Sequence, residues 1–142
     1  MQYENEARVL FTSKSENERF ARVFIAGFLT PLDLTISEMT EIKTAVSEAV
    51  TNAIIHGYEE KRGNVELFCA YRENKVYIEI ADSGSGIENI TLAREPLYTS
   101  KPEMERSGMG FTIMETFMDQ IHIQSEEGKG TRIFMEKTFT KE

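Results

Sequence analysis

The sequence has only one cysteine, Cys69, among its 142 residues. An internal disulfide bond is therefore impossible, and there is no second thiol for a CxxC metal or redox pair. Cys69 lies in residues 65–71, an apolar run typical of a β-strand, where a cysteine usually packs as a small hydrophobic residue. We expect it to belong to the core and to carry no chemistry.

Long hydrophobic segments are also missing. The sequence contains no apolar run of about 18 residues, the length that a membrane-spanning helix needs. Its start lacks the basic and then apolar pattern of a signal peptide. We therefore expect a cytoplasmic protein that has no membrane partner.

Basic residues are in deficit. The 16 Lys and Arg residues are outnumbered by 24 Asp and Glu residues, which leaves a formal net charge of −8. Such a charge repels a polyphosphate backbone at long range. Direct binding of nucleic acid is therefore disfavoured.

Common nucleotide and metal motifs are absent as well. Neither the Walker A pattern G-x-x-x-x-G-K-[ST] nor a Rossmann G-x-G-x-x-G after a strand occurs. The two histidines lie far apart in the sequence, so a histidine metal site or a catalytic triad has little support. Any nucleotide must be held by a different set of residues.

The chain does contain enough apolar residues for one core. With 40% hydrophobic and 28% charged residues, we expect a single folded domain over residues 1–142. The apolar periodicity predicts strands at 7–12, 64–72, 75–82, 121–125 and 131–137, helices at 15–30, 35–57 and 111–117, and a mostly irregular connection at 83–110. This order favours an α+β two-layer sandwich, in which helices cover one face of a mixed, mostly antiparallel sheet.

The two longer helices carry start signals. Ser15 with Glu18, and Thr35 with Glu38, follow the S/T-x-x-E pattern of a capping box. In the first helix an apolar stripe at helical spacing is expected to face the core. Its members are Phe20, Val23, Phe24, Gly27 and Phe28.

The second helix carries the first candidate for chemistry. Glu48 and Asn52 are four residues apart, so a carboxylate and an amide oxygen lie on one face, one turn from each other. The spacing alone is more typical of a solvated polar face.

A second candidate follows a predicted strand. Asp82 shares the inward face of that strand by period two, which places its carboxylate at the rim of the core. Gly84 and Gly86 allow a tight turn and a close approach to a ligand, while an ionised aspartate accepts hydrogen bonds and suits an amino group. An ordinary Asp-Gly turn remains the alternative.

A third cluster opens the last predicted helix. The unpaired N–H groups at the start of a helix form an anion site, for which phosphate is the natural occupant, although a glycine-rich hinge has the same composition. The residues are Arg106, Ser107, Gly108, Met109 and Gly110. The last strand opens with Gly-Lys-Gly-Thr at 128–131, which on its own is compatible with a simple hairpin turn.

In this order the four clusters resemble the N box, the two glycine boxes and the terminal G-x-G-T of the GHKL ATPases. Residues 41–58 and 105–115 resemble, more specifically, the anti-sigma F factors of that superfamily. The resemblance covers nearly the whole chain, weakens over residues 59–71, and implies the GHKL ATP-binding fold.

The resemblance implies a role for each cluster. Asn52 would ligate the Mg²⁺ that bridges the phosphates of ATP or ADP, and Glu48 would orient or deprotonate the attacking hydroxyl. Asp82 would accept a hydrogen bond from the adenine amino group, with Gly84 and Gly86 close to the base.

The resemblance also assigns the remaining contacts. Thr131 would support the adenine end of the nucleotide. Glu18 and Arg22 of the first helix resemble positions that contact partner proteins, although a solvated face has the same pattern. The residues that would close over the phosphates are Lys101, Arg106, Ser107, Gly108, Met109 and Gly110.

The function implied by the resemblance is that of an ATP-dependent protein serine kinase and anti-sigma factor. It would inhibit sigma factor F while ATP is bound, phosphorylate a serine of an anti-anti-sigma factor, and form a homodimer. A related stress-response anti-sigma kinase and a non-catalytic, nucleotide-gated binding module remain alternatives. A histidine kinase catalytic domain would need a histidine-bearing helix pair, for which we expect no room in 142 residues.

Overall fold

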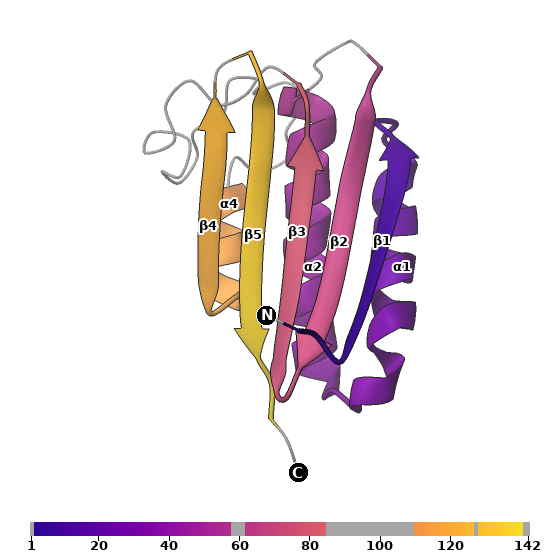
Figure 1. Ribbon diagram of the computed structural model, residues 1–142, viewed down its shortest axis with the longest axis vertical. Helices are drawn as coiled ribbons and strands as arrows, with labels where there is room; N and C mark the ends of the chain where they lie inside the picture. The colour runs from indigo at the N-terminus through magenta and orange to yellow at the C-terminus, as the bar shows by residue number, and fades with distance from the viewer. Residues whose placement is uncertain (1, 58–61, 85–109, 127, 141–142) are drawn as a thin grey trace.

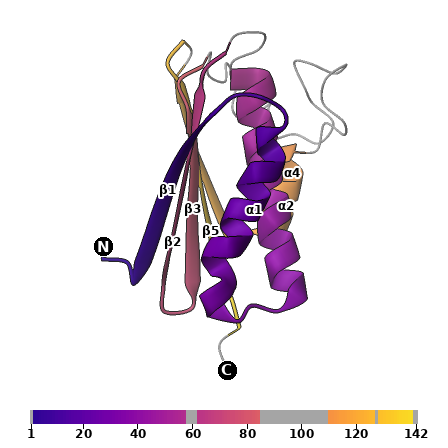
Figure 2. The same cartoon turned by 90° about the vertical axis from the view of Figure 1, so that its right-hand side faces the viewer.

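The computed structural model describes residues 2–57, 62–84, 110–126 and 128–140. Its five strands form one sheet in the order β1-β2-β3-β5-β4, and all four pairings are antiparallel. Within the described ranges, the helices α1, α2 and α4 cover one face of this sheet (Figures 1 and 2), which confirms the α+β two-layer sandwich. The strands are β1 (Asn5–Thr12), β2 (Asn64–Arg72), β3 (Lys75–Asp82), β4 (Gln120–Glu126) and β5 (Gly130–Thr138), and the helices are α1 (Asn17–Leu29), α2 (Ile36–Asn52) and α4 (Gly110–Phe117).

The core lies between the sheet and the helices. Alternate residues of the strands point toward α2, the central helix, which contacts both α1 and α4. The short helices η1 (Thr30–Leu32) and η2 (Ala53–Gly57) extend α1 and α2. Side chains that are fully buried at this interface include Ile42, Val46, Val50, Val65, Leu67, Ile78, Ile80 and Ile133.

Cys69 confirms the interpretation made from the sequence. Its side chain is completely buried in β2, and burial raises the pKa of the thiol to about 12. The neutral thiol is not a nucleophile. It contributes to packing in the core.

The apolar stripe predicted for the first helix is wrong in part. Phe20 and Val23 are 42% and 66% exposed, and Gly27 is exposed too, whereas Phe24 and Phe28 pack against the core only partly. The fully buried positions are instead Ala21, Ile25 and Leu29. The predicted stripe omitted Ala21, whose small side chain allows the helix to approach its neighbours.

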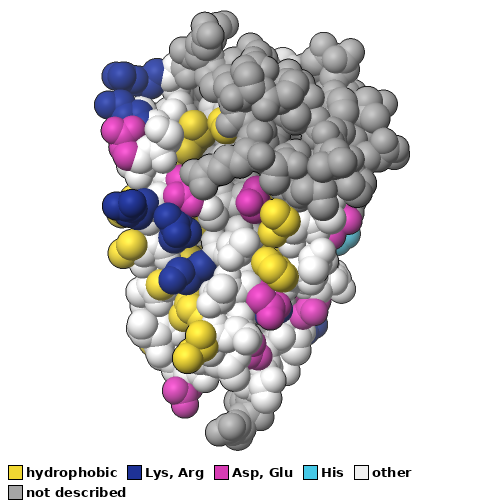
Figure 3. Space-filling view, turned by 180° about the vertical axis from the view of Figure 1, so that it is seen from behind, with side chains coloured by type: hydrophobic (Ala, Val, Ile, Leu, Met, Phe, Trp, Pro, Cys, Tyr) yellow, Lys and Arg dark blue, Asp and Glu magenta, His cyan; other side chains and the backbone are white. Residues whose placement is uncertain are grey.

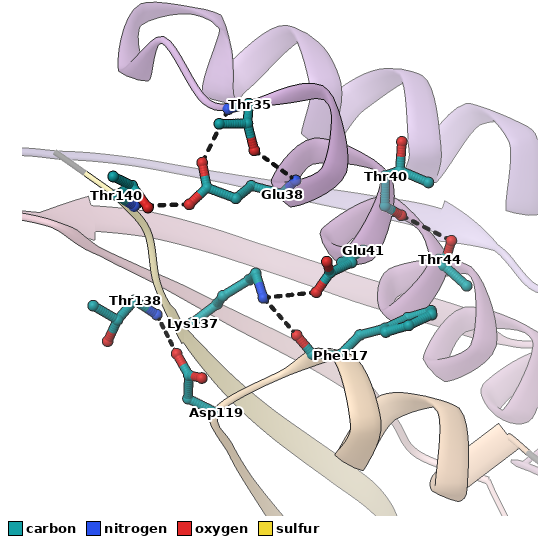
Figure 4. A network of polar contacts seen from close by, with 10 residues as sticks. All are labelled: Thr35, Glu38, Thr40, Glu41, Thr44, Phe117, Asp119, Lys137, Thr138 and Thr140. Atoms are coloured by element: carbon teal, nitrogen blue, oxygen red, sulfur yellow. Dashed lines mark hydrogen bonds and ion pairs between the residues drawn. The ribbon is translucent and has the colours of Figure 1, made fainter. Parts of the chain in front are cut away.

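The start signal of α2 is confirmed. The hydroxyl of Thr35 accepts a hydrogen bond from the Glu38 N–H at 3.0 Å, and the Glu38 carboxylate accepts one from the Thr35 N–H at 2.9 Å. The same carboxylate accepts a hydrogen bond from the N–H of Thr140 at 2.7 Å (Figure 4). Burial opposes ionisation of Glu38, but these backbone donors outweigh it and lower the pKa of the carboxyl group.

The capping box predicted at the start of α1 is wrong. The helix begins at Asn17, its N-cap Glu16 makes no side-chain capping bond, and the carbonyl of Ser15, not its hydroxyl, accepts from the N–H of Glu18. The Glu18 carboxylate is used elsewhere, because it contacts Arg22 and the hydroxyl of Ser47. A tertiary contact has replaced the local one.

The side of the sheet away from the helices carries a small aromatic cluster. Phe68 and Tyr77 lie on neighbouring strands and are covered by Tyr3, whose ring centroid lies 5.8 Å and 5.3 Å from theirs. Phe134 and the Arg8 guanidinium flank them, the latter 4.7 Å from the centroid of Phe68. The sheet is therefore apolar on both sides near its middle.

None of the helices within the described ranges is both long enough and apolar enough to span a membrane.

A buried cation joins the two layers. Lys137 of β5 is only 8% exposed. Its ammonium lies 3.1 Å from the carboxylate of Glu41 in α2. It also donates a hydrogen bond to the carbonyl oxygen of Phe117 in α4 at 2.7 Å (Figure 4). A cation at the end of a helix also interacts favourably with the helix dipole. Lys137 therefore connects the sheet to two helices at once.

We expect Lys137→Met to lower the free energy of unfolding by about 1 to 3 kcal/mol, because the Phe117 carbonyl and the Glu41 carboxylate lose their common donor. Urea unfolding followed by circular dichroism measures the loss. Lys129→Met is the matched control, since Lys129 and its partner Glu126 are 72% and 68% exposed and such a pair contributes little. Equal effects of the two substitutions would contradict the assignment.

Candidate nucleotide site

The described candidate residues converge on one end of the sandwich. Asp82 ends β3 and pairs in register with Thr131 at the start of β5. The helix η2, which continues α2 beyond Asn52, contacts both strands at that end. In Figure 1 this is the upper end, where the arrow of β3 finishes. Segments distant in sequence therefore meet where the motifs predicted a ligand.

Helix α2 presents Glu48 and Asn52 at this end. Its inward residues Ala49 and Val50 are fully buried, so the helix cannot rotate, and the two polar residues flank this buried stripe as partly exposed side chains. Asn52 is the last residue of the α-helical segment, and η2 then widens to a π-helix. Short π-helical turns are frequent at functional sites.

Asp82 is held by its own turn. One oxygen of its carboxylate accepts a hydrogen bond from the N–H of Gly84 at 2.9 Å. Burial raises the pKa of the carboxyl group, and hydrogen bonds from the backbone N–H groups of Gly84 and Thr131 offset only part of that effect. A carboxylate that is partly desolvated and aimed at the rim of the core is suited to a ligand donor.

Thr131 is nearly buried, with 4% of its surface exposed, and its hydroxyl lies 2.9 Å from the hydroxyl of Ser125 in β4. The Ser125 hydroxyl also lies within hydrogen-bonding distance of the Gly130 carbonyl, at 3.1 Å. These contacts join the end of β4 to the start of β5.

Gly130 is a residue whose role the sequence did not reveal. Its φ is +106°, and a Cβ atom built on it would lie 2.1 Å from the carbonyl oxygen of Asp82. Only glycine permits this close approach. The G-x-G-T pattern indicated only a turn. The need for glycine at position 130 follows from the register between β3 and β5, which brings the Asp82 carbonyl close to it.

The phosphate end of the candidate site is described only in part. Gly110 is the first residue of α4, and the helix is anchored by the buried Phe111 and Met114. Because α4 leads to β4, which begins at the opposite end of the sheet, the start of α4 faces the same end as Asp82 (Figure 1). Gly86, Lys101, Arg106, Ser107, Gly108 and Met109 lie outside the described residues.

The two residues predicted to contact partners lie beside α2. Glu18 and Arg22 form an ion pair one turn apart on α1, with 3.0 Å between the Arg22 Nε and the nearer carboxylate oxygen. The carboxylate of Glu18 also accepts a hydrogen bond from Ser47, which precedes Glu48 in the chain. The sequence offered no signal for this contact between helices.

Comparison with known proteins places this arrangement in a family. A profile of the histidine kinase-like ATPase domain matches residues 11–137. The anti-sigma F factor of Clostridium kluyveri is 56% identical over 137 residues, which cover 96% of each chain. That of Clostridium acetobutylicum is 57% identical over 136 residues, which cover 96% of this chain and 95% of the relative. This chain belongs to the anti-sigma F factors. The match of this chain to the histidine kinase-like ATPase domain confirms the resemblance found in the sequence.

Solved structures share the fold at low identity. The RsbU and RsbW domains of Rv1364c from Mycobacterium tuberculosis match with a TM-score of 0.71 and 17% identity, over 97% of this chain and 33% of that chain. The catalytic domain of the histidine kinase ThkA matches with a TM-score of 0.57 and 19% identity, over 96% and 99% of the two chains. This chain thus corresponds to one third of the first structure and to nearly all of the second.

Gly130→Ala is expected to disrupt the site through its collision with Asp82. The matched control is Gly128→Ala, because Gly128 also has a positive φ, +82°, but no atom lies within 4 Å of an added Cβ. The control should lower the free energy of unfolding by about 1 to 2 kcal/mol from backbone strain alone. Gly130→Ala should cost more and also weaken adenine nucleotide binding, as measured by calorimetry. If both variants bind nucleotide as tightly as the parent, the close approach is irrelevant to the site.

Asp82→Asn should stabilise the free protein at neutral pH. Burial raises the pKa of the Asp82 carboxyl group in the folded protein above its value in the unfolded chain. Its contribution to stability is therefore fully present below the unfolded pKa and is lost as the pH rises through the folded pKa. Near neutral pH the ionised carboxylate therefore destabilises the fold, and an amide, which still accepts from Gly84, removes that cost.

The gain from Asp82→Asn should shrink toward zero as the pH falls below about 4, the ordinary range of an aspartate. Urea unfolding at both pH values measures it. If the variant is less stable than the parent at neutral pH, or if its free energy of unfolding differs from that of the parent by the same amount at both pH values, the direction of the Asp82 pKa shift is wrong.

Proposed function

We propose that this protein is an ATP-dependent protein serine kinase that also inhibits sigma factor F. The observation that carries the proposal is that η2, which continues the helix of Glu48 and Asn52, contacts β3 and β5, the strands of Asp82 and Thr131, in a histidine kinase-like ATPase domain. Relatives at 56% to 57% identity over nearly the full length are anti-sigma F factors, which supports the same role here.

The adenine end of the nucleotide is proposed to lie against β3 and β5. The Asp82 carboxylate accepts a hydrogen bond from the adenine amino group, and binding of this donor favours the ionised form that burial disfavours. Gly84 and Gly86 let the backbone approach the base, and Thr131 supports it from β5. Gly130 keeps β5 close enough to do so.

The phosphates are proposed to lie between the end of α2 and the start of α4. The Asn52 amide oxygen is a suitable ligand for Mg²⁺, a hard cation that takes few protein ligands when phosphates and water supply the rest. No group of three or more His, Cys, Asp or Glu within the described ranges could hold a metal unaided. Bound Mg²⁺ would offset phosphate charge, as would Lys101, Arg106 and the N–H groups of residues 107–110.

Glu48 is proposed to be the general base. It lies one turn before Asn52 on the same rigid helix, so its distance from a metal-bound phosphate is fixed by the helix itself. A carboxylate there can orient the serine hydroxyl of the substrate and accept its proton as the phosphoryl group is transferred. The substrate is a serine of an anti-anti-sigma factor.

Partner proteins are proposed to dock on the helix face beside α1. Within the described residues, Lys and Arg side chains gather over this side of the helix layer, although the whole chain carries a net charge of −8 (Figure 3). Arg22 and Glu18 lie in this area and are the proposed contacts for sigma factor F and for the anti-anti-sigma factor. The protein is further proposed to act as a homodimer.

Glu48→Gln should separate the two activities. It keeps the size and the hydrogen-bonding capacity of the side chain but removes the group that accepts the serine proton, so phosphate transfer should fall by about 100-fold or more. Binding of Mg-ATP and of the sigma factor should survive. Transfer to the anti-anti-sigma factor is measured with labelled ATP, beside nucleotide affinity by calorimetry in the same preparation.

Asn52→Ala is the companion variant, expected to weaken Mg-ATP binding itself and hence both activities. Transfer by Glu48→Gln at the parental rate would show that Glu48 is not the base. Transfer absent from the parent despite ATP binding would favour the nucleotide-gated binding module.

A further inference from the structure

A residue of α2 contacts the ion pair that Glu18 and Arg22 form on α1. The Glu18 carboxylate accepts a hydrogen bond from the hydroxyl of Ser47 in α2. Its second oxygen accepts from a terminal nitrogen of Arg22 at 3.2 Å. Ser47 is thus the described residue that joins this pair to the central helix.

Arg22 depends on the position of that carboxylate. Its Nε lies 3.0 Å from Glu18, yet it is buried and has no hydrogen bond of suitable geometry among the described residues, so charge attraction holds it there. The Arg22 side chain is otherwise 40% exposed, and an ion pair of this kind between two long side chains contributes little on its own. If the carboxylate rotates away, nothing else described fixes the guanidinium.

Ser47 can fix the carboxylate because it lies on the most extensively packed helix. Its neighbours Val46 and Ala49 are completely buried, and the helix is packed against both α1 and α4. Glu48, the next residue along the chain, belongs to the same turn of α2. One turn of one helix therefore carries both the anchor of the ion pair and the proposed base.

We propose that Ser47 is a positioning residue, whose hydroxyl holds Glu18, and through it Arg22, in the orientation that meets the partner protein. The inference rests on the proposed partner surface of α1. Its consequence is that partner contact is set from the helix that also carries Glu48 and Asn52.

The test compares three variants of the full chain. Ser47→Ala should weaken binding of the purified anti-anti-sigma factor about three- to tenfold, the size of effect expected from a residue that acts through another. Its affinity for Mg-ATP should be unchanged. Ser47→Thr keeps the hydroxyl and should restore partner binding. Thr44→Ala is the matched control and should have no effect, because the bond that the Thr44 hydroxyl makes among the described residues stays within α2, to the carbonyl of Thr40 at 2.8 Å.

A double-mutant cycle with Arg22→Ala decides whether Ser47 acts through Arg22. In the Arg22→Ala background, Ser47→Ala should cause no further loss, whereas additive losses would overturn the inference. If Arg22→Ala weakens partner binding and Ser47→Ala does not, the inference is wrong while the partner surface stands. If Arg22→Ala itself leaves partner binding intact, the proposed partner surface has failed, and the inference fails with it.

Discussion

The arrangement of the two layers depends on the buried ammonium of Lys137. One charge from β5 meets a carboxylate of α2 and the last carbonyl of α4, so sheet and helices cannot slide past each other without leaving a polar group unpaired in the core. This contact lies at the end of α4 opposite to Gly110. It anchors the C-terminal end of α4. The first N–H groups of a helix have no acceptor within the helix, and those of α4 lie at the end of the sandwich where the phosphates are proposed to bind.

At the other end of the sandwich the constraint is steric. Gly130 allows β5 to press against the backbone of Asp82, and Thr131 is fixed by Ser125 behind it. The carboxylate of Asp82 is held in a partly desolvated position at a cost to the free protein. Titratable groups whose pKa is shifted by desolvation cluster at functional sites. The two ends of the molecule therefore differ: a buried ion pair joins the layers at one end, and a partly desolvated carboxylate lies at the other, where the nucleotide is proposed to bind.

Local patterns predicted the elements well. The hairpin of β2 and β3 and the capping box of Thr35 follow from residues close in sequence, and the structure confirms both. The capping box of Ser15 failed because Glu18 bonds Ser47 on another helix, and the stripe of α1 failed because the small Ala21 was given no weight. The nucleotide clusters could be predicted because each is short and local. The close approach of Gly130 to Asp82 and the contact of Ser47 with Glu18 could not, because they exist only once distant strands and helices are packed together.

The place of β5 in the sheet affects how the chain folds and how a ligand stabilises it. It pairs with β3 only after the chain has passed through α4 and β4, so the central pairing is among the most distant in sequence and is slow to form. A ligand that touches Asp82 and Thr131 together bridges that pairing and binds only the folded chain. By mass action such a ligand raises the free energy of unfolding. On the function proposed above, the supply of nucleotide would therefore set the stability of the folded chain as well as its activity.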